Sequence, residues 1–138
     1  MEFNKNKVIN YAFWFWFIMV IVLSVLPGTP KSRINIWGLD FRMDYMEHLV
    51  VYFILGLLYV NRKRRLVSET IFIKVLYVLM WMIFAIVTEL VQKFIAGRSF
   101  NPNDMYYNVI GIILGLVLTI IYFNKSNKRM MHEKLVSK

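Results

Sequence analysis

Four apolar runs divide the chain, and polar residues gather between and at the ends of them. A helix needs about 20 apolar residues to cross a hydrocarbon core about 30 Å thick, and three of the runs are close to that length. The pattern predicts an all-α, polytopic membrane protein, a four-transmembrane-helix bundle whose spans cover residues 8–26, 44–60, 71–95 and 105–123. These spans form one domain of residues 1–124, and residues 125–138 form a basic tail.

The second run differs from the others because polar residues are built into it. Its continuous apolar part, residues 49–60, is too short to span a bilayer. Extending the helix back to Asp44 gives a sufficient length, and it brings Glu47 and His48 into or against the membrane. The first run, in contrast, ends at Pro27 and Gly28, which favour a helix end. We expect it to be an uncleaved anchor, since "SVLPGTP" has no small-residue cleavage site.

Composition supports the membrane assignment. The chain is 59% hydrophobic and 17% aromatic, with a mean hydropathy of +0.53, which is too apolar for an ordinary soluble domain. It contains no cysteine, so disulfides and thiolate chemistry are excluded.

The net charge of +9 reflects Lys and Arg at the ends of the apolar runs, a distribution typical of topology signals that face lipid headgroups. We therefore expect membrane lipids as partners and no nucleic acid. Of the 17 basic residues, five lie on one predicted side of the membrane: Lys31, Arg33, Arg42, Lys93 and Arg98. All the others lie on the opposite side, which predicts that both termini are cytoplasmic.

Three of the predicted spans carry polar residues on the outer side, at spacings of three or four. These residues are Asp44, Glu47 and His48 on the second span, Glu89 and Gln92 on the third, and Asp104 and Asn108 on the fourth. Such spacings place side chains on one helical face, so the three groups can meet at a common centre. An ionisable group inside a bilayer costs about 2.5 to 3.5 kcal/mol unless it faces a partner or water. Either a structural cluster that fixes helix register or a site for binding or proton transfer explains the pattern.

Single residues in this region suggest particular chemistry. His48 can accept or donate a proton near neutral pH. Arg98 has the planar fork that suits a carboxylate partner or an anionic ligand, and both roles are open. Asp104 follows Pro102 and is placed to open the fourth helix.

Metal binding and helix packing are the remaining questions. Asp44, Glu47, His48 and Glu89 offer one imidazole and several carboxylates, but without a diagnostic metal-binding spacing. The sequence therefore predicts no metal and no cofactor. Small residues let helices approach closely, which is the role expected of Gly56, Gly111 and Gly115.

These residues resemble the pattern of the VanZ-like family, small bacterial membrane proteins named for a member associated with teicoplanin resistance. The resemblance spans roughly residues 24–119. It rests on "SVLPG", on Asp44, His48 and Tyr52 in "DYMEHLVVY", on Glu89 and Gln92 in "ELVQ", and on Arg98, Asp104, Asn108, Gly111 and Gly115. The chain departs from the family in having Tyr45 where a lysine usually follows the first aspartate. Arg42 is the residue expected to supply the missing cation.

The resemblance implies a multi-pass protein of the bacterial plasma membrane with a role in the cell envelope. The leading hypothesis is an outward-facing polar site that binds or shields an anionic, lipid-linked cell-wall precursor or meets the glycopeptide itself. The first alternative is a membrane enzyme in which Glu89 or His48 is the general base, Asp44 orients it and Arg98 stabilises an anionic group. The second is a non-catalytic assembly partner whose polar residues serve helix packing.

Overall fold

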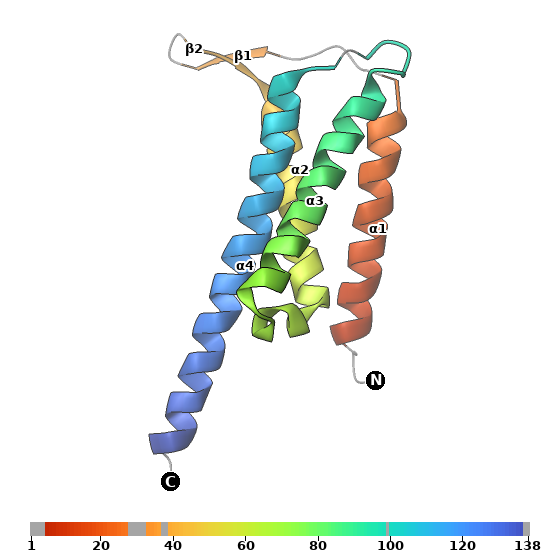
Figure 1. The fold of residues 1–138 in the computed structure, drawn as a ribbon. Helices are drawn as coiled ribbons and strands as arrows, with labels where there is room; N and C mark the ends of the chain where they lie inside the picture. The colour runs from red at the N-terminus through yellow and green to blue at the C-terminus, as the bar shows by residue number, and fades with distance from the viewer. Residues whose placement is uncertain (1–4, 28–32, 37–38, 99, 137–138) are drawn as a thin grey trace.

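The computed structural model describes residues 5–27, 33–36, 39–98 and 100–136 (Figure 1). Within them lie four long helices: α1 (Lys5–Val25), α2 (Met43–Arg62), α3 (Ile71–Gln92) and α4 (Pro102–Val136). Each is long and apolar enough to cross a membrane. The predicted all-helical, four-span membrane architecture is therefore confirmed.

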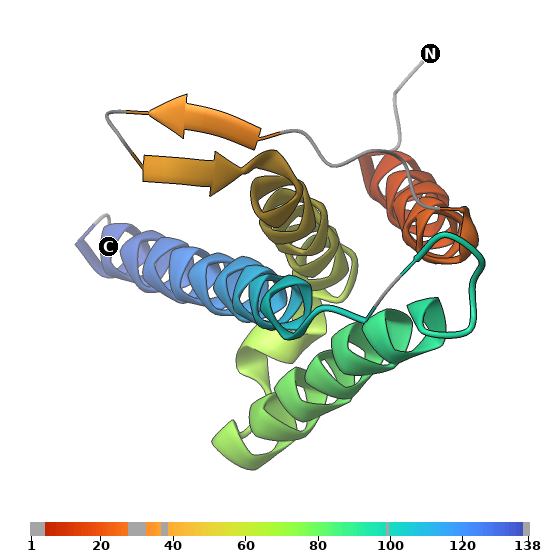
Figure 2. The same cartoon turned by 90° about the horizontal axis from the view of Figure 1, so that it is seen from above.

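The shorter elements lie at the two ends of the bundle. Strands β1 (Arg33–Ile36) and β2 (Leu39–Arg42) pair antiparallel between α1 and α2, and the 3-10 helix η1 (Arg64–Ser68) lies between α2 and α3. We call the two ends the hairpin end and the η1 end. The start of α1 and the end of α4 both lie at the η1 end (Figure 1). The hairpin extends sideways from the start of α2, beyond the bundle (Figure 2). The positive-inside pattern predicts that the η1 end faces the cytoplasm.

Three features of the elements differ from the sequence-based boundaries. The hairpin was not expected, and Gly28 lies outside the described residues. Helix α3 ends at Gln92 instead of reaching residue 95, because the chain turns there and Gly97 adopts a positive φ of 75°. Helix α4 continues through most of the segment assigned to a basic tail. That segment contains neither proline nor glycine, so nothing in it ends the helix.

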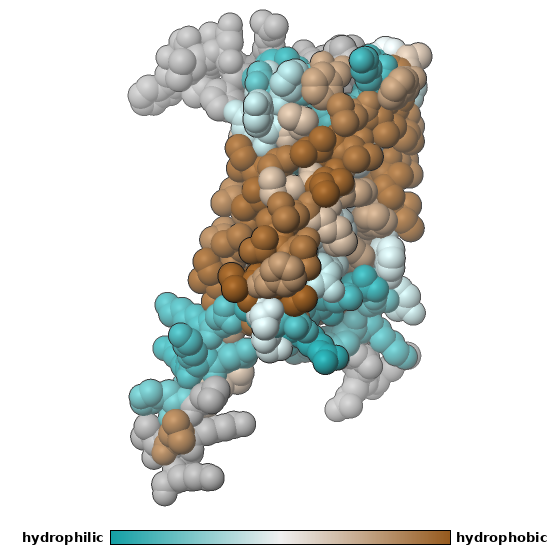
Figure 3. Space-filling model, viewed as in Figure 1, coloured by the Kyte–Doolittle hydropathy of each residue, from teal (hydrophilic) through white to brown (hydrophobic). Residues whose placement is uncertain are grey.

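The outside of the bundle carries a broad apolar band with polar residues above and below it (Figure 3). Large hydrophobic side chains on α1, α3 and α4 are more than half exposed, among them Phe15, Phe72, Ile83 and Ile121. Such a surface is unfavourable in water and favourable in lipid. The fold therefore fits a multi-pass membrane protein.

Close contact between α2 and α4 depends on three glycines. A Cβ atom at Gly56 would lie 2.8 Å from the carbonyl oxygen of Ile112. A Cβ atom at Gly111 or Gly115 would collide with a carbonyl oxygen of α2, that of Leu49 or Phe53. The absence of side chains lets the two backbones touch, as in other membrane helix pairs. This contact fixes the residues of α2 against those of α4 at the hairpin end.

Basic residues at the η1 end pack on aromatic rings. The guanidinium carbon of Arg62 lies 4.8 Å from the ring centroid of Phe13 and 4.7 Å from that of Trp14. Its Nε donates a hydrogen bond to Asn10 Oδ1 at 2.7 Å. Arg64 similarly lies over Phe123, at 4.9 Å. These cations gain cation–π attraction while keeping access to the membrane surface.

Candidate functional site

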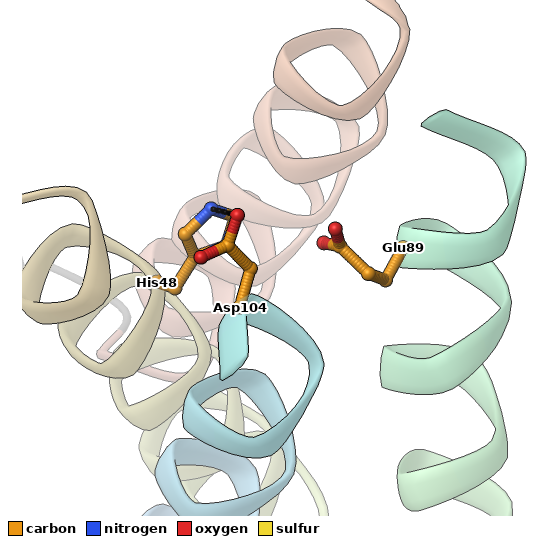
Figure 4. A group of neighbouring side chains, drawn as sticks. All are labelled: His48, Glu89 and Asp104. Carbon is orange, nitrogen blue, oxygen red and sulfur yellow. Dashed lines mark ion pairs between the residues drawn. The ribbon is translucent and has the colours of Figure 1, made fainter. Parts of the chain in front are cut away.

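Side chains from three helices converge at the hairpin end of the bundle. His48 of α2, Glu89 of α3 and Asp104 of α4 each place one nitrogen or oxygen atom within 4.8 Å of the others. Figure 4 shows the Glu89 carboxylate directed toward the other two. Glu89 is 0% exposed and Asp104 is 2% exposed, whereas His48 is half-buried. We call these residues the polar triad.

His48 is oriented by Asn108, one turn beyond Asp104 on α4. Its Nδ1 donates a hydrogen bond to Asn108 Oδ1 at 2.8 Å. The donor must be the Nδ1–H, because a carbonyl oxygen only accepts. The other nitrogen, Nε2, lies 3.9 Å from Asp104 Oδ2. Asn108 thus turns Nε2 toward the two acids of the triad.

Glu89 is the most isolated charge-bearing group of the site. Its Oε1 accepts a hydrogen bond from the backbone N–H of Asn101 at 3.4 Å. Its Oε2 is buried and has no hydrogen-bond partner among the described residues. Asn108 Nδ2 is a buried donor that likewise has no hydrogen-bond partner among the described residues. A buried polar atom left unpaired costs about 1 to 3 kcal/mol, so the site holds two groups that a ligand would satisfy.

Asp104 is held by the start of α4. Asn101 precedes Pro102, and its Oδ1 accepts from the backbone N–H of Asn103 at 3.1 Å, which caps the helix. Asn101 Nδ2 donates to Asp104 Oδ1 at 2.8 Å. Asp104 lies in the first turn, where the helix dipole favours an acid. Asn101 therefore links Glu89 to Asp104. Sequence reasoning missed it, although asparagine before Pro102 is a recognisable helix-start signal.

Tyr52 and Thr88 form a buried contact between α2 and α3 beneath the triad. Thr88 donates to the carbonyl oxygen of Ala85 at 2.8 Å. The Tyr52 hydroxyl therefore donates to Thr88 Oγ1. Tyr52 was expected in the site from the family resemblance, whereas Thr88 was not expected. Thr88 directly precedes Glu89 in the chain, so this contact helps to position Glu89.

Asp44, four residues before His48 on α2, forms an ion pair with Arg42. Arg42 Nε donates to Asp44 Oδ1 at 3.1 Å, and its Nη2 contacts Oδ2. The hydrogen bond to Asp44 raises the pKa of the Arg42 guanidinium above its ordinary value. The guanidinium also lies 4.6 Å from the ring centroid of Tyr45. The expectation that Arg42 supplies the cation missing at position 45 is thus confirmed.

Arg98 holds the end of α3 to the end of α1. Its Nε and Nη2 donate to the carbonyl oxygens of Leu26 at 2.9 Å and Leu23 at 3.0 Å. Its Nη1 donates to Gln92 Oε1 at 2.8 Å. Every nitrogen of the guanidinium is therefore engaged by a neutral oxygen. Pairing with an acid, one of the two roles open from the sequence, is not among these contacts, because the carbonyl oxygens at the end of α1 occupy the guanidinium.

Glu47 is the predicted site residue that points away from the triad. It is exposed on α2 although it precedes His48 directly. Neighbouring helical residues differ in direction by about 100°, so only one of the two can face the bundle interior. Glu47 is therefore useful as a matched control carboxylate.

The structure also bears on metal binding, which the sequence did not predict. One imidazole nitrogen and two carboxylates are ligand types that divalent cations accept. The three residues, His48, Glu89 and Asp104, come from segments far apart in the chain, so no local sequence motif identifies them as a group.

Fold and site together define a multi-pass membrane protein with a buried polar triad at one end of a four-helix bundle. Residues 3–123 match the model of the VanZ/LLP1 family. The chain belongs to this family, as the resemblance predicted. Comparison with curated proteins and with solved structures finds no match.

Proposed function

We propose that this VanZ-family protein lies in the bacterial plasma membrane with its hairpin end outward, and that the triad binds the headgroup of an anionic, lipid-linked envelope component. Occupying or shielding that component lowers the sensitivity of the cell to glycopeptides such as teicoplanin. The site then operates where cell-wall precursors and glycopeptides meet.

The observation that carries the proposal is the unpartnered Glu89 Oε2. Glu89 is fully buried, and its carboxylate is directed at His48 and Asp104. Asn108 Nδ2 is a second buried polar atom without a hydrogen-bond partner among the described residues. Hydroxyl and amide groups of an envelope precursor would pair with both atoms. A cluster that served packing alone would be expected to satisfy its own buried groups.

The test compares the teicoplanin susceptibility of cells that produce the wild type, Glu89→Gln, His48→Ala or the control Glu47→Gln, with membrane abundance matched by quantitative blotting. We expect the wild type and Glu47→Gln to protect, and the two triad variants to lose protection. Equal protection by all variants would support a packing role for the triad. An inactive wild type would contradict the resistance role.

A second candidate function is acid–base catalysis on the same headgroup. It is favoured by the His48–Asn108 hydrogen bond, which fixes the ring and leaves Nε2 facing the carboxylates. In this case His48 or Glu89 is the base, and Asn108 takes the orienting role that the sequence suggested for Asp44. Catalysis predicts altered lipid or cell-wall precursor profiles in cells that overproduce the wild type. Unaltered profiles together with intact protection would leave binding as the function.

A further inference from the structure

The triad suits the neutral hydroxyl and amide groups of a headgroup, but its charge composition does not suit direct contact with the anionic group. Glu89 and Asp104 are both acids, and each is at most 2% exposed. The nearby arginines are already engaged, Arg98 by three neutral oxygens and Arg42 by Asp44. A phosphate or carboxylate placed here would face two carboxylates with only His48 to offset them. An additional positive charge would remove this conflict.

We propose that His48 Nε2, Glu89 and Asp104 bind one divalent transition-metal cation of the Zn²⁺ or Mn²⁺ type. Two carboxylates neutralise a dication, so the occupied site carries no net charge from these three groups in a region of low dielectric. The imidazole nitrogen favours a transition metal, since Mg²⁺ and Ca²⁺ prefer oxygen ligands.

The distances allow such a site after small side-chain shifts. The three ligand atoms lie within 4.8 Å of one another, and His48 Nε2 lies 3.9 Å from Asp104 Oδ2. Ligand atoms around a tetrahedral zinc are about 3.3 Å apart, so closure requires movements of about 1 Å. The residues come from three helices whose backbones already hold them at this separation.

The surrounding contacts resemble those that orient metal ligands. A histidine that binds a metal through one nitrogen commonly donates its other N–H to an oxygen, as His48 does to Asn108. Asn101 similarly contacts one oxygen of each acid, Asp104 Oδ1 and Glu89 Oε1. Glu89 Oε2 remains as a buried, unpartnered atom. A cation bound there would satisfy it.

Three protein ligands leave at least one coordination position for water or for an oxygen of another molecule. If the proposed function is correct, a headgroup phosphate is the natural occupant of that position. This extension rests on the proposed function, whereas metal binding by the triad does not. The two are therefore tested separately.

The experiment uses the full chain, purified without a histidine tag in detergent micelles and stripped with a chelator. Zn²⁺ or Mn²⁺ is added, unbound metal is removed, and bound metal is measured by elemental mass spectrometry. We expect one ion per wild-type chain. In Glu89→Gln and Asp104→Asn, we expect the metal affinity to fall by a factor of about ten or more. Glu47→Gln and His132→Ala, which alter an exposed acid and an exposed histidine, should bind as the wild type does.

Thermal unfolding of each variant provides the second measurement, because a ligand that binds only the folded state raises the unfolding midpoint. The added metal should raise it for the wild type and for both controls, but not for folded triad variants. A folded wild type that binds no ion, or Glu89→Gln and Asp104→Asn that bind like the wild type, would overturn the proposal. Metal binding without antibiotic protection would contradict only the proposed function.

Discussion

The two ends of the bundle differ in where their charged residues lie. At the η1 end, Arg62 and Arg64 lie over aromatic rings, Phe13 and Phe123. At the hairpin end, Glu89 and Asp104 are buried in the bundle interior. Positive charge at the η1 end needs no explanation beyond topology. Two buried acids that share one histidine do need one, which is why we assign the function to the hairpin end.

The largest expected effect comes from separating α2 and α4 beside the triad. In Gly111→Leu, the side chain would collide with the backbone of α2 at Leu49. We expect a loss of about 3 kcal/mol in the free energy of unfolding, at the upper range for overpacking, together with loss of antibiotic protection. Denaturant titration in micelles measures the change. Ile110→Leu, at an exposed neighbour on the same helix, should change little. A stable Gly111→Leu protein would show that the close contact is not required.

A smaller effect of opposite sign is expected from Glu89→Gln in metal-free protein. A neutral amide of the same shape removes the cost of a buried carboxylate, so we expect stabilisation by about 2 kcal/mol. At the η1 end, Glu69 pairs with a largely exposed Arg65, and Glu69→Gln should alter stability by less than about 0.5 kcal/mol. The unfolding free energies of both variants, measured in chelator, decide the point. Destabilisation by Glu89→Gln would show that the triad is a satisfied structural network.

The fold was more predictable than the site. Hydrophobic runs and their length were sufficient to predict four spans, because bilayer thickness imposes a strict requirement on helix length. The hairpin was missed, since its residues carry no turn motif that was recognised. Asp104 was placed correctly at the start of a helix from its position after Pro102.

Site contacts depend on helix rotation, which spacing constrains only in part. The spacing of Asp44, Glu47 and His48 suggested one face, yet only His48 enters the triad. Arg98 was expected to meet a charged partner, but its guanidinium donates hydrogen bonds to carbonyl oxygens at the end of α1. Such backbone acceptors have no sequence signature. The polar composition of the site was therefore predictable, whereas its individual pairs were not.

The smallest effects should show that arginine has a different role at each end. Arg98 uses three nitrogens on three oxygens, so lysine cannot replace it, and we expect both Arg98→Ala and Arg98→Lys to lose about 1 kcal/mol of stability. Arg62 works mainly through its positive charge over Phe13 and Trp14. Arg62→Lys keeps that charge and should lose less than about 0.5 kcal/mol. Unfolding titrations of the two lysine variants provide the comparison. Equal losses would mean that the hydrogen bond to Asn10 gives Arg62 the same dependence on geometry as Arg98.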